Sequence, residues 1–456
     1  MTDWLMSHNQ LERFDALEVV RPNDCVRACY LIRGALDGDR LAQAVSLTAQ
    51  RHPVLSASVI RTDGELRTVP GALPVELRYA AAGEVLWSAA SSAGNYPTGV
   101  RFGALSLPDS SVFAIRMLSV ASDDHLLLMT ADHSFMDARS FTLLHEDLTR
   151  AYKLLAGPRA NTEPFAADKP MTFGEWTKWE RRHLAGERLE RLFRFWERQL
   201  ANTGPLPAVG LAGGSRRVEG IAPKQQILKL SGDQRAHAKL LSRAWNVSEF
   251  SLLGVLFKSC VSAVSTICFG KRTKNIPTFG AFANRIPLES NNSIGGFANS
   301  VVITSSILDE DNLEIACRRE AEKVFRASCH QDLPHALIVR RMDPALYGIR
   351  YKRDLNSIPR YLNFDWPFAQ GKPTLVLDGA NVFTVSDPAP ELPRGGLRVL
   401  VQLEEDGWSL DCRYDPSVYP REVSEAVDVV WRKLSSSWLN APNHTFRRVL
   451  SYVSGA

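Results

Sequence analysis

Strand-like and helix-like segments alternate along this chain, and the alternation constrains its fold more than any other feature. The run at 125–131 is almost continuously apolar, which is typical of a strand covered on both faces. Residues 37–51 place Leu41, Ala44 and Val45 on one face of a helix. Segments of these two kinds in alternation predict an α/β fold, in which helices cover a sheet.

The alternation occurs once in each half of the chain. In the first half, we expect strands at 26–34, 54–61, 112–118 and 125–131, and helices at 37–51 and 140–155. In the second half, we expect strands at 225–230, 300–307, 397–403 and 408–414, and helices at 231–246, 248–266, 312–327 and 421–439. Connectors rich in proline and glycine flank a helical stretch between the halves. We therefore predict an N-terminal lobe at 1–175, connecting helices at 176–203 and a C-terminal lobe at 204–456.

Composition and charge narrow the classes of function. Of 456 residues, 45% are apolar and 23% are charged, an ordinary globular mixture. A net charge of +4 cannot supply the concentrated positive field that nucleic-acid binding needs, so we expect no nucleic-acid partner. The seven cysteines form no CxxC pair, and His330 and His335 lack a third ligand at plausible spacing. We therefore expect no metal site.

Two sequence features bear on localisation. Asp3, Glu12 and Asp15 stand where a signal peptide would be apolar. The most apolar stretch, at 250–270, has Lys258 in its middle, which favours a buried globular helix over a membrane span. We therefore expect a cytoplasmic protein that has no membrane partner.

The stretch LLLMTADHSFMDARSF at 126–141 carries the candidate chemistry. A buried strand leads directly into His133, and Asp137 follows at the expected start of the next helix. A histidine at this place is held by rigid structure yet lies at the edge of the sheet, where a cleft can form. Neutral imidazole accepts a proton from an amine or an alcohol near pH 7. His133 is therefore the candidate base, and Asp137 is expected to cap the helix or to pair with a buried arginine.

The spacing of these two residues also fits a second interpretation. The pattern HxxxD occurs often by chance, and a hydrogen-bonded structural histidine followed by an ordinary N-cap aspartate has the same sequence. Neither composition nor periodicity decides between the two interpretations.

Six segments, in order along the chain, carry a family resemblance. They are QRHPVL at 50–55, ADHSFMDARS at 131–140, an aromatic and acidic helix at 173–201, SIGGFANSVV at 293–302, HQDLP at 330–334 and RDLNSIP at 353–359. Together they resemble the conserved segments of condensation domains of nonribosomal peptide synthetases, in the chloramphenicol-acetyltransferase-like superfamily. Each segment is weak by itself, but all six in family order indicate the family strongly.

The resemblance implies an α/β fold of two chloramphenicol-acetyltransferase-like lobes, which form a V-shaped pseudo-dimer around a central tunnel. A donor acyl thioester on the phosphopantetheine of an acyl or peptidyl carrier protein enters from one face. An acceptor, either carrier-bound or a free small molecule, enters from the other face. The resemblance implies that the two meet at His133, the catalytic residue, and that Asp137 paired with Arg285 supports the site. The residues expected to line the tunnel or the site are Asp132, Ala138, Phe297, Asn299 and Ser300.

Two positions depart from the family pattern. The segment at 131–140 resembles the family's core motif HHxxxDG, in which Asp132 stands at the first histidine and Ala138 at the glycine. Asp132 either points inward and favours the charged form of His133, or points to solvent or supports the structure. We expect the second orientation, because adjacent strand residues face opposite sides. Ala138 adds a methyl group where glycine allows close approach, so a narrower tunnel and a loss of activity both stay open.

The implied function is amide or ester formation in nonribosomal peptide or hybrid polyketide biosynthesis, with no bound cofactor. We expect a free-standing monomer, since no adenylation, carrier or thioesterase region is recognisable. Two alternatives remain. One is a CoA-dependent O-acyltransferase of the HxxxD type, whose late DFGWG-like segment is matched only loosely by NFDWPFAQGKP at 363–373. The other is an inactive domain that recruits carrier proteins.

Overall fold

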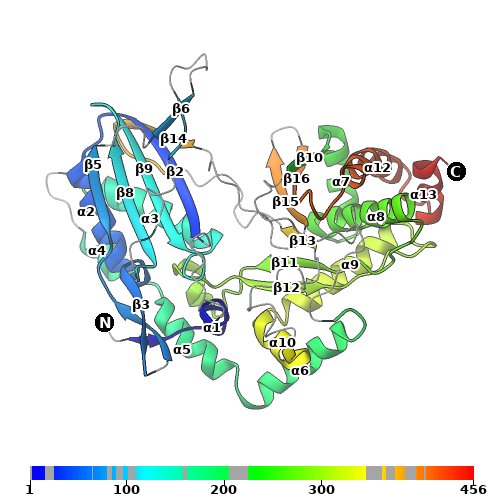
Figure 1. The fold of residues 1–456 in the computed structure, drawn as a ribbon, viewed down its shortest axis with the longest axis horizontal. Coiled ribbons are helices and arrows are strands. Elements are labelled where there is room, and N and C mark those ends of the chain that lie inside the picture. The colour runs from blue at the N-terminus through cyan, green and yellow to red at the C-terminus, as the bar shows by residue number, and fades with distance from the viewer. Residues whose placement is uncertain are drawn as a thin grey trace. The chain divides into compact units, whose positions relative to one another are not determined.

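A computed structural model describes most of the chain (Figure 1). The described residues are 3–15, 25–63, 65–79, 85–88, 96–100, 107, 110–157, 162–204, 224–345, 362–365, 375–385, 397–404 and 407–455. The chain divides into two compact units. Unit 1 comprises Met1–Gly186, Ala283–Ala298 and Gly371–Pro390, and unit 2 comprises Glu187–Phe282, Asn299–Gln370 and Glu391–Ala456.

Each unit is compact in space but discontinuous in sequence. The chain first leaves unit 1 at Gly186, within the stretch that the sequence analysis treated as connecting helices. Residues 283–298 and 371–390 belong to unit 1, although the predicted C-terminal lobe at 204–456 included both. Such returns depend on packing between distant segments, which the periodicity of a single segment does not report. The predicted N-terminal lobe at 1–175 therefore lacks residues 283–298, which are called the crossing segment below and which contribute to the candidate site.

Unit 1 is built on a five-stranded sheet in the order β14-β2-β9-β8-β5. Its strands are β14 (Ala380–Val385), β2 (Cys25–Gly34), β9 (Asp124–Asp132), β8 (Phe113–Ser119) and β5 (Val75–Tyr79). The first four pair antiparallel, and β5 pairs parallel to β8. The central strand β9 is the apolar run of the sequence, and it is the strand that leads into His133.

Two helices, α2 (Gly38–Arg51) and α3 (Ala138–Leu154), pack against one face of this sheet (Figure 1). Leu41 and Val45 of α2 are buried in one cluster with Met129 of β9, as the helical spacing predicts. Full burial of such a side chain contributes about 1.5–3 kcal/mol. The helix-covered face thus holds β9, and therefore the start of the His133 turn, in a fixed position.

The other elements of unit 1 surround this core. The helices are α1 (His8–Asp15), α4 (Glu163–Ala167) and α5 (Phe173–His183), with 3-10 turns η1 (Pro53–Ser56) and η3 (Leu288–Asn292). The short strands are β1 (Trp4–Leu5), β3 (Ala57–Thr62), β4 (Glu65–Pro70), β6 (Val85–Ser88) and β7 (Tyr96–Val100). They form a β1-β4-β3 sheet and a β6-β7 pair. The strand predicted at 54–61 is wrong in its first part, because the fixed φ of Pro53 suits the helical turn η1.

Unit 2 contains a six-stranded sheet in the order β10-β16-β15-β13-β11-β12. Its strands are β10 (Lys224–Leu230), β16 (Gly407–Tyr414), β15 (Leu397–Glu404), β13 (Leu362–Asp365), β11 (Thr278–Phe282) and β12 (Asn299–Ile303). The predicted hairpin is confirmed, with Leu403 opposite Trp408 in an antiparallel ladder. The strand predicted at 300–307 ends at Ile303, four residues early.

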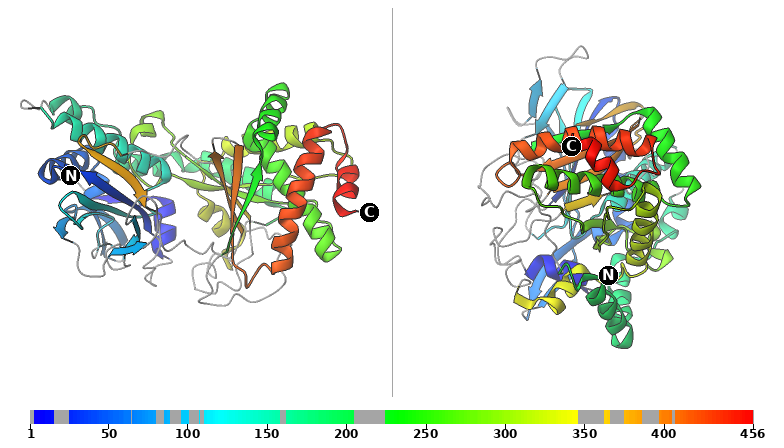
Figure 2. Two further views of the ribbon diagram at one scale, coloured as in Figure 1. Left: turned by 90° about the horizontal axis from the view of Figure 1, so that it is seen from above. Right: turned by 90° about the vertical axis from the view of Figure 1, so that its right-hand side faces the viewer.

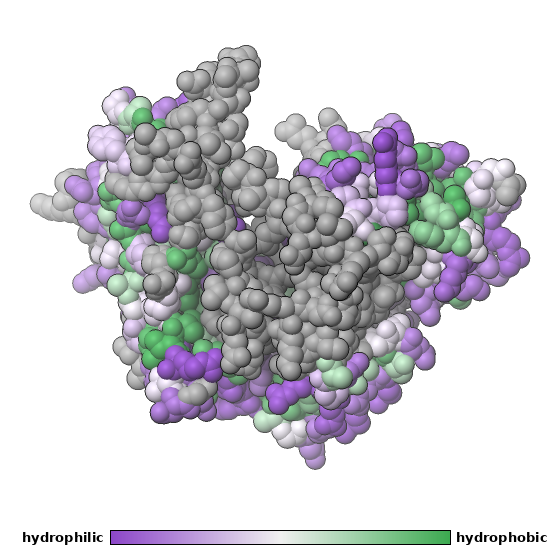
Figure 3. Space-filling model, viewed as in Figure 1, coloured by the Kyte–Doolittle hydropathy of each residue, from purple (hydrophilic) through white to green (hydrophobic). Residues whose placement is uncertain are grey.

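Helices α8 (Glu249–Phe269) and α12 (Arg421–Asn440) lie side by side on this sheet (Figure 2). The remaining helices of unit 2 are α6 (Gly186–Leu200), α7 (Gly232–Ala244), α9 (Leu313–Ser328), α10 (His335–Met342) and α13 (Phe446–Ser454). Both units therefore have helices packed on a mixed sheet, which confirms the predicted α/β fold class. On the face shown in Figure 3, the coloured part of the surface carries both hydrophobic and hydrophilic residues, as is ordinary for folded proteins.

Helix α8 is the single helix among the described residues that is long and apolar enough to cross a membrane. In the structure, 78% of its most apolar window is buried within the protein. Lys258 at its middle is 1% exposed, and its Nζ lies 2.9 and 3.0 Å from the carboxylate oxygens of Glu320 on α9. Burial lowers the pKa of Lys258, while the Glu320 carboxylate acts in the opposite direction and favours the cation. The helix thus packs as a core element around an internal ion pair.

Replacing Lys258 by methionine should leave the Glu320 carboxylate buried without its partner. We expect the free energy of unfolding to fall by about 3–5 kcal/mol, measured by chemical denaturation. The control is Arg326→Met on the same helix α9, because Arg326 pairs with Glu322 on an exposed face and its loss should change stability by about 0–1 kcal/mol. Equal effects of the two substitutions would contradict this account of the α8 core.

Candidate active site

The strand β9 ends in a tight turn that carries His133. The backbone N–H of Phe135 donates to the carbonyl of Asp132 at 2.9 Å and closes the turn. The carboxylate of Asp132 accepts a hydrogen bond from the N–H of Ser134 at 2.8 Å, and a second one from the Ser134 hydroxyl. A side chain that binds the backbone two residues later forms an Asx turn. Asp132 therefore stabilises the turn from which the exposed His133 side chain projects.

The imidazole of His133 is oriented by the same turn. Its Nδ1 lies 3.1 Å from the carbonyl oxygen of Met136, a residue that is buried. Because a carbonyl oxygen only accepts, this hydrogen bond requires the proton on Nδ1. In the neutral ring, the lone pair then resides on Nε2. Nε2 is therefore the atom of His133 that can take a proton from a reacting group.

Asp137 caps helix α3 and at the same time binds the crossing segment. Its Oδ1 accepts from the N–H of Ser140 at 2.8 Å and from Nη2 of Arg285 at 2.9 Å. Its Oδ2 accepts from the N–H groups of Phe297 and Ala298 at 3.1 and 3.3 Å. The side chains of Asp137 and Arg285 are each 5% exposed. The predicted pairing of Asp137 with Arg285 is therefore present in the structure.

The guanidinium of Arg285 has further partners on the crossing segment. Nη1 donates to the carbonyls of Ser290 and Ser293 at 2.7 and 2.6 Å, and Nη2 also donates to the hydroxyl of Ser140 at 2.9 Å. The guanidinium carbon lies 4.3 Å from the centre of the Phe297 ring. Burial lowers the pKa of Arg285 and the Asp137 carboxylate opposes this, but an arginine stays charged in a protein.

Ser140, a residue that no sequence motif singled out, completes the junction. Its hydroxyl donates to the carbonyl of Gly295 at 2.7 Å and accepts from the Gly295 N–H at 3.0 Å. The N–H of Asp137 also donates to the Gly295 carbonyl, at 3.2 Å. The only available signal was its position three residues after an N-cap aspartate, which does not distinguish it from an ordinary helical serine.

Gly296 allows the crossing segment to lie directly against the His133 turn. A Cβ added to Gly296 would stand 2.0 Å from the carbonyl oxygen of Ser134, and one added to Gly295 would stand 2.2 Å from the Phe173 ring. No side chain fits at such distances, so glycine is required for this backbone contact. The backbone of the SIGGFAN segment thus packs directly against Ser134 of the His133 turn.

Two of the residues expected to line the tunnel do not line open space. Phe297 is 0% exposed, and its ring centre lies 5.1 Å from that of Phe173 and 5.0 Å from that of Trp176. Asn299 is buried within unit 2, where its Nδ2 donates to the carbonyls of Gln331 and Leu333 at 2.7 and 2.8 Å. In the structure the Phe297 ring fills the core beside the glycines, and the Asn299 amide holds the HQDLP segment. A part for either residue in lining a substrate path stays a prediction.

Ala138 and Ser300, which were also expected to line the tunnel or the site, are exposed in the structure. Ala138 is the exposed first residue of α3, directly after Asp137. Ser300 is exposed on the edge strand β12 of unit 2. Their part in lining a substrate path stays a prediction.

The QRHPVL segment has a supporting position in unit 1. Arg51 Nε and His52 Nε2 lie 3.1 and 2.6 Å from the same carboxylate oxygen of Asp147 on α3. Burial lowers the pKa of His52, and Asp147 partly opposes that effect. These contacts join the end of α2 to α3, the helix that Asp137 caps. The RDLNSIP segment at 353–359 lies outside the described residues.

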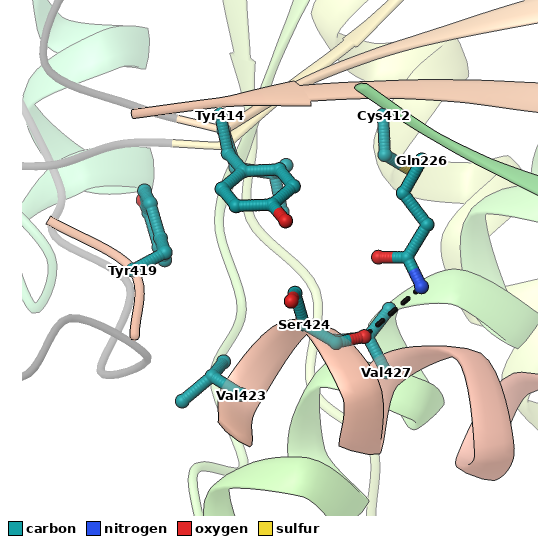
Figure 4. Close-up of a pocket in the computed structure, with 8 residues that line it drawn as sticks. Gln226, Cys412, Tyr414, Tyr419, Val423, Ser424 and Val427 are labelled. Carbon is teal, nitrogen blue, oxygen red and sulfur yellow. Dashed lines mark hydrogen bonds between the residues drawn. The ribbon is translucent and has the colours of Figure 1, made fainter. Parts of the chain in front are cut away.

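A small cavity of about 20 Å³ lies inside unit 2, between the sheet and α12 (Figure 4). This is room for about one water molecule. Its lining consists of Gln226, Leu397, Cys412, Tyr414, Tyr419, Val423, Ser424 and Val427. Gln226 Nε2 donates to the carbonyl of Ser424 at 3.0 Å beside it. Because unit 2 alone forms this cavity and His133 belongs to unit 1, we do not assign it to the candidate site. Over the described part of the chain, no three His, Cys, Asp or Glu side chains group to hold a metal.

A strand-end histidine whose Nε2 carries the lone pair, followed by an aspartate that caps the next helix and pairs with a buried arginine, is the arrangement expected of the acyltransferases with an HxxxD motif. The profile of the condensation domain family matches residues 24–346. The chain belongs to the condensation domain family.

Curated relatives of the chain are much longer than the matched region, whereas solved structures of similar length share its fold. Enniatin synthase of Fusarium equiseti is 24% identical over 343 residues, which cover 72% of this chain but 10% of that protein. The chain thus matches only a small part of that relative. The starter condensation domain of rhizomide synthetase, solved with C8-CoA, has a TM-score of 0.69 at 14% identity, with 98% of this chain and 96% of that chain covered. The X-domain of teicoplanin biosynthesis, solved with OxyB, has a TM-score of 0.70 at 15% identity, with 98% and 95% covered. These likenesses confirm the predicted two-lobed fold class.

Replacing Asp137 by alanine should destabilise unit 1, because it leaves Arg285 buried without its counter-ion and removes the acceptor of two N–H groups of the crossing segment. We expect the free energy of unfolding to fall by about 3–5 kcal/mol, with a lower melting temperature. Glu146→Ala, on an exposed position of the same helix, should stay within about 0.5 kcal/mol of the wild type. An Asp137→Ala protein as stable as the wild type would refute a supporting role for the ion pair.

Replacing Gly296 by alanine should displace the His133 turn, since the new methyl group overlaps the carbonyl of Ser134. We expect a loss of about 1–3 kcal/mol in stability from overpacking, together with a loss of turnover. Gly38→Ala is the control, because its Cβ would lie 3.5 Å from Met117, an ordinary contact. If Gly296→Ala behaves like Gly38→Ala in both thermal melting and turnover, the turn does not depend on this backbone contact.

Proposed function

We propose that this chain catalyses a condensation reaction. An acyl or aminoacyl group passes from the phosphopantetheine thioester of a carrier protein to an amine or hydroxyl acceptor, and an amide or an ester forms. The observation that carries this proposal is the exposed imidazole of His133, fixed through Nδ1–H at the end of a buried strand. Membership of the condensation domain family supports it.

The proposed step uses one proton acceptor. The acceptor nitrogen or oxygen bonds to the thioester carbonyl carbon while Nε2 of His133 takes the proton that it loses. The carbon–sulfur bond then breaks, and the proton passes from the imidazolium to the departing thiolate. The same ring can also hold the acceptor and stabilise the charged tetrahedral species.

Positioning should contribute more to the rate than proton transfer. Alignment of two bound reactants lowers a barrier by about 7–11 kcal/mol. A general base gives about 10²–10⁴-fold, which corresponds to roughly 3–5 kcal/mol. The contacts described above accordingly hold the turn that carries the ring. Asp132, Asp137 and Arg285 act through the turn, as supporting residues.

The proposed partners are acyl or peptidyl carrier proteins. A similar structure, the rhizomide starter domain, holds C8-CoA, which supports recognition of a thioester on either a carrier or CoA. The X-domain structure contains OxyB as a partner, and it supports the alternative in which this chain recruits proteins without turnover. Both alternatives are distinguishable by experiment.

Replacing His133 by alanine should reduce product formation about 10²–10⁴-fold if the ring is the general base. The assay offers acyl-carrier protein with an amine, acyl-carrier protein with an alcohol, and acyl-CoA with each acceptor, and detects product by mass spectrometry. His237→Ala, which removes an imidazole from α7 of unit 2, should retain wild-type turnover.

Full turnover by purified His133→Ala would refute the proposed role. Carrier binding by the wild type without any product, over all four substrate pairs, would favour recruitment. Product from acyl-CoA with the alcohol, and none from acyl-carrier protein, would favour the CoA-dependent O-acyltransferase alternative.

A further inference from the structure

The N-terminal segment 3–15 docks on helix α5 through polar contacts just before and at the first residue of α1. Arg181 Nη2 donates to the carbonyl of Met6 at 2.5 Å, and the N–H of His8 donates to Oε2 of Glu180 at 3.0 Å. Trp4 packs so closely on Gly174 that an added Cβ there would stand 3.0 Å from the indole ring. Glu180 therefore accepts the N–H of His8, the first residue of helix α1, where the helix dipole favours a negative charge.

Glu180 is buried more completely than its charge would suggest. Glu180 is 1% exposed, and its Oε1 has no hydrogen-bond partner within the described part of the chain. Gln10 is in the same situation: its Oε1 accepts from the N–H of Ser7 at 2.9 Å, and its Nε2 lacks a partner there. Because Ser7 and His8 are consecutive residues, the two side chains lie at the same end of α1. Buried polar atoms without a hydrogen-bond partner lower the stability of a folded protein and are rare.

Desolvation raises the pKa of Glu180 to about 7, while the His8 N–H and the Arg181 charge act in the opposite direction. Of the other charged groups on the elements packed here, Asp3 and Arg67 pair with each other at 2.8 Å. A glutamate in solvent has an ordinary value near 4.5. Because the docked value is raised, docking is strongest below about pH 4.5 and weakens as the pH rises through 7.

The docked segment also touches the candidate site. Asn9 Nδ2 donates to the carbonyl of Ala298 at 3.4 Å. The N–H of the same Ala298 donates to Oδ2 of Asp137. Helix α1 therefore contacts the crossing segment at the residue that Asp137 holds.

We propose that residues 3–15 form a proton-controlled latch on α5, closed when Glu180 is neutral and loosened when it is ionised. In the closed state, the latch supports the crossing segment behind Asp137 and acts as a positioning element for His133. Only this second part rests on the proposed function.

Hydrogen exchange of the 3–15 segment, followed by mass spectrometry from pH 5 to 8 and corrected for intrinsic rates, tests the latch. In the wild type, protection should fall on the order of 100-fold over this range. Glu180→Gln keeps the shape and cannot ionise, so its protection should be the same at every pH. Glu146→Gln, an exposed carboxylate of unit 1, should behave like the wild type. Equal pH dependence in the wild type and Glu180→Gln, or a flat profile in both, would overturn the latch.

Turnover tests the link to the site separately. The ratio of Glu180→Gln to wild-type turnover should be near one at pH 6 and should rise at pH 8, where only the wild-type latch loosens. If the exchange results hold but this ratio is the same at both pH values, the positioning role is wrong. The exchange measurement does not depend on activity, so a failure of the proposed function would leave the latch itself tested.

Discussion

The ion pair between Asp137 and Arg285 joins two parts of the chain that are 148 residues apart. One carboxylate caps α3, binds the guanidinium and accepts two N–H groups of the crossing segment. Both side chains are buried, where a lone charge is strongly unfavourable, so the pair and its hydrogen bonds form together or not at all. The His133 turn lies between the strand β9 and this junction, and its geometry depends on both.

In the candidate site, most of the named residues hold the backbone in place, and one imidazole is the candidate reacting group. The strand, the Asx turn of Asp132, the Gly296 contact and the Asp137 junction fix the position of one imidazole. That imidazole needs only one further hydrogen bond, from Nδ1–H to Met136, to place its lone pair on Nε2. A reaction that depends mainly on alignment is served well by such an arrangement, because rigid placement contributes more to the rate than the strength of the base.

Three buried charges in this chain show how a partner decides the effect of burial. The Nζ of Lys258 donates to both carboxylate oxygens of Glu320, and this ion pair lies in the α8 core. Arg285 shares its charge among Asp137 and several carbonyls. Glu180 has one backbone N–H and an adjacent arginine, and desolvation raises its pKa to about 7. The first two have ion-pair partners that favour their charged forms, whereas desolvation places the pKa of Glu180 close to neutral pH.

The element pattern and the candidate residues could be predicted from the sequence: the apolar run of β9, the cap at Asp137, and the motifs that point to His133 and Arg285. These are local signals, since periodicity and capping act over a few residues. The three-dimensional packing was needed to show that 283–298 returns to unit 1, that Ser140 and Gly296 belong to the junction, and that Phe297 and Asn299 are buried. Those facts depend on contacts between residues more than a hundred positions apart or on the packing of neighbouring segments, and no local pattern in a single chain encodes them.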